Sequence, residues 1–148
     1  MHSGPHIPFQ HAEQTESDLA LLYSFLDACP EAMWLRDEEG MHVYVNEKAR
    51  SMGVQPGDHL QIMRNRGYSP DAIANAAMDD KYVFHSGKPL IKTVAVTDPK
   101  GETKTLLVTK FPIYDANRRM LVGGLAVDLT EFVATLQATD PASEPVAA

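Results

Sequence analysis

The stretch Val122-Gly-Gly-Leu-Ala-Val-Asp-Leu-Thr-Glu131 is the most informative part of the sequence, because it is a small apolar strand that ends abruptly at a polar junction. Asp128 and Glu131 have the spacing of a helix N-cap and an acidic third helical residue, with Asp in the place of Ser or Thr. We therefore expect the strand to end at Asp128 and a helix to run over 130–137. A strand joined to a helix in this way acts as a lever, since distortion of the sheet would move the helix.

Upstream of this stretch, an acidic turn separates two short strands. The strands are predicted over 32–36 and 41–45, and the turn between them is Asp37-Glu-Glu-Gly40, whose glycine can supply a positive φ. The pair is therefore predicted to form a β-hairpin. Asn46 directly follows the second strand, where it can cap a short helix over 47–52.

A longer helix and three strands lie between the hairpin and the final junction. Ser69-Pro70-Asp71 is a strong helix start, and the helix is predicted to run to about His85. The three strands that follow are predicted over 90–97, 103–113 and 121–127. The long middle strand alternates, and one of its faces consists of Lys104, Leu106, Val108 and Lys110. Because antiparallel strands are set apart from the helices, the pattern indicates an α+β domain.

The first helix of the chain is predicted over 16–28 and carries an unusually wide apolar stripe. Such a helix must bury this stripe against its own sheet or against a second copy of the protein. We expect a homodimer formed through the residues at helical spacing, which are Leu19, Leu22, Phe25 and Leu26.

Length, charge and cysteine content limit the class of protein. The 148 residues suffice for one domain, predicted over 16–137 between a flexible segment, 1–15, and a disordered tail, 138–148. A net charge of -7 argues against a nucleic-acid surface. Cys29 is alone, which excludes an internal disulfide and fits a reducing compartment. No apolar run is long enough to span a bilayer, so we expect a cytoplasmic protein without a membrane partner.

The order of these elements, from about residue 19 to 131, resembles the PAS family of sensor and interaction domains. The residues that carry the resemblance are Glu39-Gly40 in the first turn, Asn46 after the second strand, Gly87-Lys88-Pro89 before the third strand and Asp128-Leu129-Thr130 at the exit. The resemblance implies a PAS-like five-stranded antiparallel sheet with short helices inserted after strand two, flanked by N-terminal and C-terminal helices. It also implies a space between the sheet and the small helices that can hold a ligand.

Four residues are candidates for lining that space: Met63, Met78, Tyr82 and His85. The last three lie at i, i+4 and i+7 of one helix and form one stripe, and such a stripe is more often plain core. His85 could ligate haem iron as in some PAS sensors, although a histidine at a helix end is commonly stabilised there by the helix dipole. Flavin photochemistry is disfavoured, because the cysteine that it needs is missing from the expected segment.

Other ionisable residues give weaker signals. Asp79 and Asp80 are expected to be a solvated pair, given Lys81 beside them. Lys104 and Lys110, together with His59 and either Arg64 or Arg66, could bind a carboxylate ligand, as in some extracellular PAS-like sensors. The sequence contains no motif of a known catalytic or metal site, so we expect no enzyme and no metal.

These observations favour a non-catalytic sensory module of signal transduction. Binding of a small apolar ligand or of a partner would shift the sheet, and the junction of Asp128, Thr130 and Glu131 would relay the shift to the C-terminal helix. The residues after Glu131 are too few to encode an effector domain, so the sequence is either a single-domain protein or a piece of a longer one, and a signalling protein that acts in trans is a possible partner. Two alternatives remain: a dimeric interaction adaptor that needs no ligand, and a small cavity enzyme.

Overall fold

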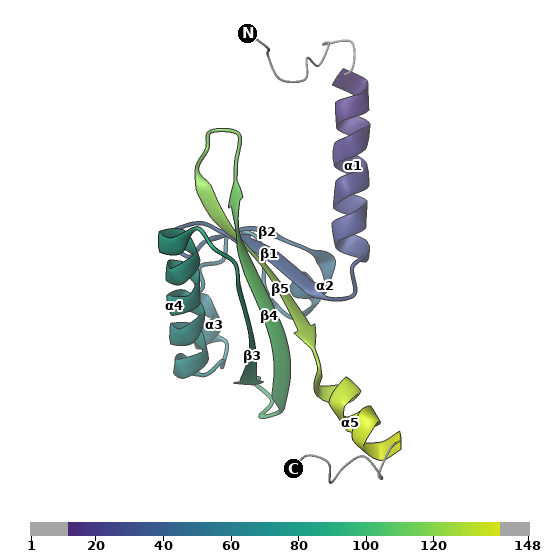
Figure 1. Ribbon diagram of the computed structural model, residues 1–148, viewed down its shortest axis with the longest axis vertical. Helices are drawn as coiled ribbons and strands as arrows, with labels where there is room; N and C mark the ends of the chain where they lie inside the picture. The colour runs from purple at the N-terminus through teal and green to yellow at the C-terminus, as the bar shows by residue number, and fades with distance from the viewer. Residues whose placement is uncertain (1–11, 140–148) are drawn as a thin grey trace.

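The computed structural model describes residues 12–139 (Figure 1). In chain order the elements are α1 (Ala12–Ala28), β1 (Ala32–Arg36), β2 (His42–Val45), α2 (Glu47–Ser51), α3 (Ile62–Asn65), α4 (Pro70–Ser86), β3 (Leu90–Thr97), β4 (Thr103–Tyr114), β5 (Met120–Asp128) and α5 (Thr130–Thr139). The strands form one antiparallel sheet in the order β2-β1-β5-β4-β3. This arrangement confirms the predicted α+β fold, including the short helices between the second and third strands.

The two glycines of the Val122–Glu131 stretch lie at the centre of the sheet and each makes room for an aromatic ring. A Cβ on Gly124 would lie 2.2 Å from the indole of Trp34, which is paired with it on β1. A Cβ on Gly123 would lie 2.6 Å from the ring of Phe111, its partner on β4. Successive residues of a strand face opposite sides of the sheet, so the two rings cover opposite faces.

Asn46 joins the hairpin to both flanking helices. Its side-chain oxygen accepts hydrogen bonds from the backbone N–H of Met33 and of Ala49, and the latter bond caps α2 as predicted. Its side-chain amide donates to the carbonyl oxygens of Leu26 and Glu31. The side chain is fully buried, and all four of its hydrogen-bonding positions are therefore satisfied.

Helix α4 covers one face of the sheet (Figure 1). It begins as predicted, because the hydroxyl of Ser69 accepts from the backbone N–H of Ala72 and Pro70 occupies the first helical position. It ends at Gly87, whose φ of 67° is the left-handed conformation that glycine adopts at low cost. The face of α4 turned toward the sheet carries the buried residues Ile73, Asp80 and Val83.

Helix α1 stands away from the sheet (Figure 1) and begins at Ala12. The predicted flexible segment over 1–15 was therefore too long, because residues 12–15 are helical; residues 1–11 lie outside the described part of the chain. At the other end α5 extends to Thr139, so the predicted tail over 138–148 begins too early, and residues 140–148 are again outside it. Within residues 12–139, no helix has both the length and the apolar character needed to cross a membrane.

Candidate ligand cavity

A cavity of about 220 Å³ lies between the inner face of the sheet, α4 and the segment that contains α2 and α3. The helix contributes the short side chains of Ala72 and Ala76 to its wall, and side chains of this size leave space between helix and sheet. The remaining wall is largely apolar and includes Leu60, Met63, Ile73, Val94, Val96, Leu106 and Val108. Ligand sites in proteins have this character, with a few polar groups that fix the orientation of the ligand.

Trp34 supplies one of these polar groups. It is the single tryptophan of the chain, it lines the cavity, and its indole lies over Gly124. The indole nitrogen Nε1 is buried and, among the described residues, has no hydrogen-bond partner. A buried N–H group without an acceptor costs free energy, which makes it a marker of either strain or a missing partner.

A buried group of three charged side chains forms one end of the cavity. The carboxylate of Asp80 on α4 accepts from Arg36 Nε at 2.8 Å and from a terminal nitrogen of Arg36 at 3.1 Å. The same carboxylate accepts from Lys110 Nζ on β4 at 2.8 Å, and Lys110 also donates to the carbonyl oxygen of Ala76 at 3.0 Å. Asp80 therefore ties α4 to two strands of the sheet. All three charged residues are at most 5% exposed.

The pKa values of Asp80 and Lys110 are both lowered, for different reasons. Burial acts to raise the pKa of Asp80, but the hydrogen bonds and charges of Arg36 and Lys110 outweigh it and hold the pKa below its ordinary value. Burial and the nearby Arg36 charge lower the pKa of Lys110 in spite of the attraction of Asp80. The negative charge of Asp80 therefore offsets only part of the unfavourable effect of burial and of Arg36 on the charged form of Lys110.

His42 extends this buried group as a neutral side chain. Its Nε2 lies 3.2 Å from a terminal nitrogen of Arg36, and its Nδ1 lies 2.8 Å from the carbonyl oxygen of Asp58. A guanidinium only donates hydrogen bonds, so we assign Nε2 as the acceptor and Nδ1 as the protonated nitrogen. Burial and the Arg36 charge both lower the pKa of His42, which agrees with this neutral form.

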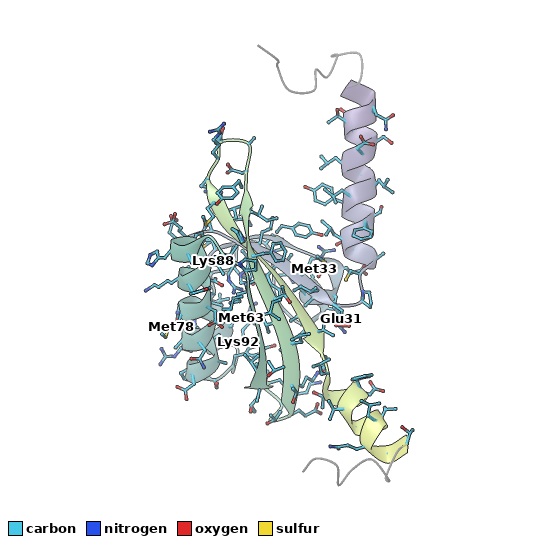
Figure 2. The ribbon with its side chains drawn as sticks, viewed as in Figure 1. Glu31, Met33, Met63, Met78, Lys88 and Lys92 are labelled. Carbon is cyan, nitrogen blue, oxygen red and sulfur yellow. The ribbon has the colours of Figure 1, made fainter. Side chains whose placement is uncertain are left out.

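Of the four residues predicted to line the cavity, Met63 on α3 does so, and the three on α4 do not. Met63 lines the cavity, whereas Met78 lies on the outer side of α4 (Figure 2). Met78 is 67% exposed, Tyr82 is 47% exposed and His85 is also exposed. The predicted stripe exists but faces away from the sheet, because Asp80 and not Met78 marks the inward side of the helix. The position of His85 therefore does not support haem ligation in this cavity.

The expectation of a solvated Asp79–Asp80 pair was wrong as well. Asp80 is buried in the charged group, and Asp79 lines the cavity and forms an ion pair with Lys92 Nζ at 2.9 Å. Lys110 was considered as a ligand-binding cation only together with surface residues, and its pairing with Asp80 was missed. The sequence signal for it was its position on the strand face that also carries Leu106 and Val108.

The predicted relay residues lie at the end of the sheet beside a second, wider hollow of about 680 Å³. This hollow shares Met63, Tyr68 and Leu106 with the cavity and is also lined by Lys104, Asp128 and Glu131. It therefore adjoins the cavity and reaches the point where β5 leads into α5.

The junction is tied to the neighbouring strand as well as to the helix. Asp128 Oδ1 accepts from the backbone N–H of Thr130 at 2.9 Å, two residues on and not three as a capping box would have it. The hydroxyl oxygen of Thr130 accepts from the backbone N–H of Thr105 on β4 at 2.8 Å, and Leu129 N–H donates to the carbonyl oxygen of Thr105 at 2.8 Å. A displacement of β4 would therefore be felt directly at the start of α5.

Within residues 12–139, no three His, Cys, Asp or Glu side chains are grouped so that they could hold a metal ion.

Comparison with known families assigns the fold. The model of the PAS fold matches residues 26–134, which is most of the chain. The chain belongs to the PAS family. None of the curated protein sequences matches this PAS domain significantly.

Solved structures of low sequence identity share the fold. The PAS domain of BvgS from Bordetella pertussis has a TM-score of 0.62 at 19% identity, and the match covers 87% of this chain and 98% of that one. VqmA bound to DPO matches with a TM-score of 0.62 at 19% identity over 74% of this chain and 57% of VqmA. A structure of the Vibrio cholerae VqmA dimer without its target DNA matches with a TM-score of 0.63 at 19% identity, over 76% of this chain and 53% of that chain. This PAS domain thus spans little more than half of the VqmA chains that it resembles.

Proposed function

We propose that this PAS domain is a non-catalytic sensory module that binds a small molecule in the cavity between the sheet and α4. The observation that carries the proposal is the buried indole N–H of Trp34, which has no protein acceptor among the described residues and lines a mainly apolar cavity. Because Nε1 is buried against β5, a bound molecule would satisfy that group after a small movement of the indole away from the strand. The similarity to VqmA, whose structure is described as bound to DPO, is additional support.

We propose further that occupancy of the cavity is relayed through Asp128, Thr130 and Glu131 to α5. Support comes from the shared lining of the cavity and the adjoining hollow, and from the bonds between Thr130 and Thr105. The hydrogen bond from Thr130 N–H is the main reason that the pKa of Asp128 is lowered, and it outweighs the opposite effect of burial. The carboxylate is therefore ionised near neutral pH and keeps its bond to the helix start.

The third part of the proposal is a homodimer through α1. In the single chain, Leu19 and Leu22 are about half exposed, at 49% and 50%, and Phe25 is 70% exposed, while Leu26 is half-buried at the base of the helix. An apolar stripe of this kind is stabilised by a matching surface, and we propose the α1 stripe of a second copy as that surface. The VqmA structure is described as a dimer, which is consistent with this arrangement.

We propose a signalling protein in trans as the receiver of the signal and no direct contact of this chain with nucleic acid. VqmA acts on target DNA, but the chain matches only about half of VqmA, and its own net charge of -7 opposes binding to phosphate backbones. The lone, half-buried Cys29 suits a reducing cytoplasm.

The test of the sensor and its relay compares two preparations of the same protein. One is purified under native conditions, and the other is stripped of bound molecules by unfolding and refolding. Native mass spectrometry should show additional mass only in the first. Hydrogen–deuterium exchange at α5 should be slower in the first than in the second.

The variant Asp128→Ala should abolish this difference in α5 exchange without abolishing the additional mass. Asp115→Ala is the matched control, because Asp115 makes the same kind of bond to a backbone N–H two residues on, in the turn between β4 and β5. If Asp128→Ala leaves the difference unchanged, the relay is wrong. If neither preparation carries or takes up a small molecule, a ligand-independent interaction adaptor is the better account.

A further inference from the structure

The charged end of the cavity has more hydrogen-bond donors than acceptors. Lys110 has three N–H groups, and its two bonds to Asp80 and Ala76 leave one of them without a partner in the described part of the chain. Arg36 has five N–H groups, of which three are used in the bonds to Asp80 and His42. The indole N–H of Trp34 adds a further donor.

The same end of the cavity also carries excess positive charge. Arg36 and Lys110 are both cations, and Asp80 is the one carboxylate between them. The neighbouring Asp79 is neutralised by Lys92, and His42 is neutral. Two cations therefore face one buried anion. Since burial of an uncompensated charge is costly, this end of the cavity is an attractive place for an additional negative charge.

The donors converge because of the register of the sheet. Trp34 on β1 and Lys110 on β4 are both paired with Gly124 on β5, so the two side chains flank the same glycine on the inner face. The absence of a side chain on Gly124 brings the indole N–H edge over the central strand. Arg36 lies over the ring of the same tryptophan, with its guanidinium carbon 5.4 Å from the ring centre.

We propose that the cavity selects a small, mainly apolar molecule with one anionic oxygen, such as a carboxylate or an enolate, which accepts from Trp34 Nε1 and from the charged end formed by Lys110 and Arg36. This proposal rests on the sensor function proposed above and adds the chemical class of the ligand. The volume of about 220 Å³ lies below the range of about 300–1,000 Å³ that is typical of sites for drug-sized molecules. The molecule is therefore small, with an apolar body against the Val94, Leu106 and Val108 wall.

A matched pair of probes tests the class of ligand directly. Benzoate and toluene have the same apolar ring, and only benzoate has a carboxylate. Binding of each probe to the wild-type protein at pH 7 is followed by the fluorescence of Trp34, the sole tryptophan, and by calorimetry. We expect benzoate to bind at least tenfold more tightly than toluene. If toluene binds as tightly as benzoate, the charge selection is wrong but the sensor function stands. If neither binds, the proposed ligand class is wrong, and native mass spectrometry of the natively purified protein decides the sensor function separately.

The role of the indole N–H is tested with Trp34→Phe, which keeps an aromatic ring and removes the donor. Measured by calorimetry, this variant should bind benzoate about tenfold more weakly and toluene within about twofold of the wild type. Tyr114→Phe is the control, because it removes an exposed donor that does not line the cavity. An unchanged affinity of Trp34→Phe for benzoate would overturn the assignment of Trp34. If this variant does not fold, the comparison of benzoate with toluene on the wild-type protein still decides the charge selection.

Discussion

The variant Gly124→Ala examines the close approach of Trp34 to the central strand. The new Cβ would lie 2.2 to 2.4 Å from three atoms of the indole, whereas ordinary contacts begin at 3.4 Å. The ring or the strand must therefore move by about 1 Å, and the ring is held between the sheet and the Arg36 guanidinium. Overpacking of this kind costs about 1–3 kcal/mol. Alanine in a strand regains about 0.5–1 kcal/mol relative to glycine. We expect a net loss of about 1–2 kcal/mol in the free energy of unfolding.

Gly123→Ala is the matched control one residue away. Its Cβ would meet the ring of Phe111 at 2.6 Å on the opposite face of the sheet, where Phe111 is only half-buried and can turn aside. We expect the free energy of unfolding to change by less than about 1 kcal/mol, since alanine regains part of the steric cost.

The assay for both variants is urea denaturation followed by far-ultraviolet circular dichroism, together with the emission maximum of Trp34 and the affinity for benzoate. Gly124→Ala should shift the emission and weaken the binding of benzoate, and Gly123→Ala should do neither. If Gly124→Ala is as stable as the wild type, with unchanged emission and affinity, Trp34 does not lie over Gly124 and the geometry of the cavity is wrong.

Three further predictions concern the charged group and α1. Asp80→Asn should lower the free energy of unfolding by about 3 kcal/mol, because it leaves two buried cations unpaired, whereas Arg119→Ala, in an exposed ion pair, should cost less than about 0.5 kcal/mol in the same urea titration. The pKa of His42 is lowered in the folded protein, so the unfolded chain takes up this proton at higher pH, and the free energy of unfolding should fall as pH drops below about 6.5. His42→Gln should remove this pH dependence. The separate loss of stability that is linked to protonation of Asp80, below about pH 4, should remain. Leu22→Glu should weaken the dimer at least tenfold in sedimentation experiments without lowering the free energy of unfolding of the monomer, and a dimer of unchanged affinity would exclude the α1 interface.

The elements and their order were predictable because their signals are local. Ser69 and Asn46 cap helices through side-chain bonds to backbone groups three residues on, and such bonds depend on a few adjacent residues. The Gly-Gly pair of β5 was visible as an unusual feature, but its role was not. It depends on rings from β1 and β4 that only the register of the sheet brings to it.

The charged end of the cavity was not predictable, since its contacts are distant in sequence. Asp80 lies 44 residues from Arg36 and 30 residues from Lys110. Periodicity showed that Met78, Tyr82 and His85 share a face of α4, but it does not state which face is turned inward. Hydrophobicity favours the apolar stripe as the inward face, whereas the structure buries a carboxylate that two cations stabilise.

Two features of the sequence point toward the charged end of the cavity. Lys110 shares a strand face with Leu106 and Val108, and Arg36 shares one with Trp34 and Ala32. A cation that continues an apolar face must either reach the edge of the sheet or find a buried partner. The partner itself would still have required the packing of α4 onto the sheet.

Native mass spectrometry of the wild-type protein and Gly124→Ala, side by side, tests the central claim that the cavity holds a small molecule. We expect the wild-type chain of 16.3 kDa to carry additional mass, either as purified or after incubation with benzoate, and to release it on denaturation. Gly124→Ala should carry much less of this additional mass. A wild-type protein that shows only the bare mass of its subunits in both samples would contradict the account.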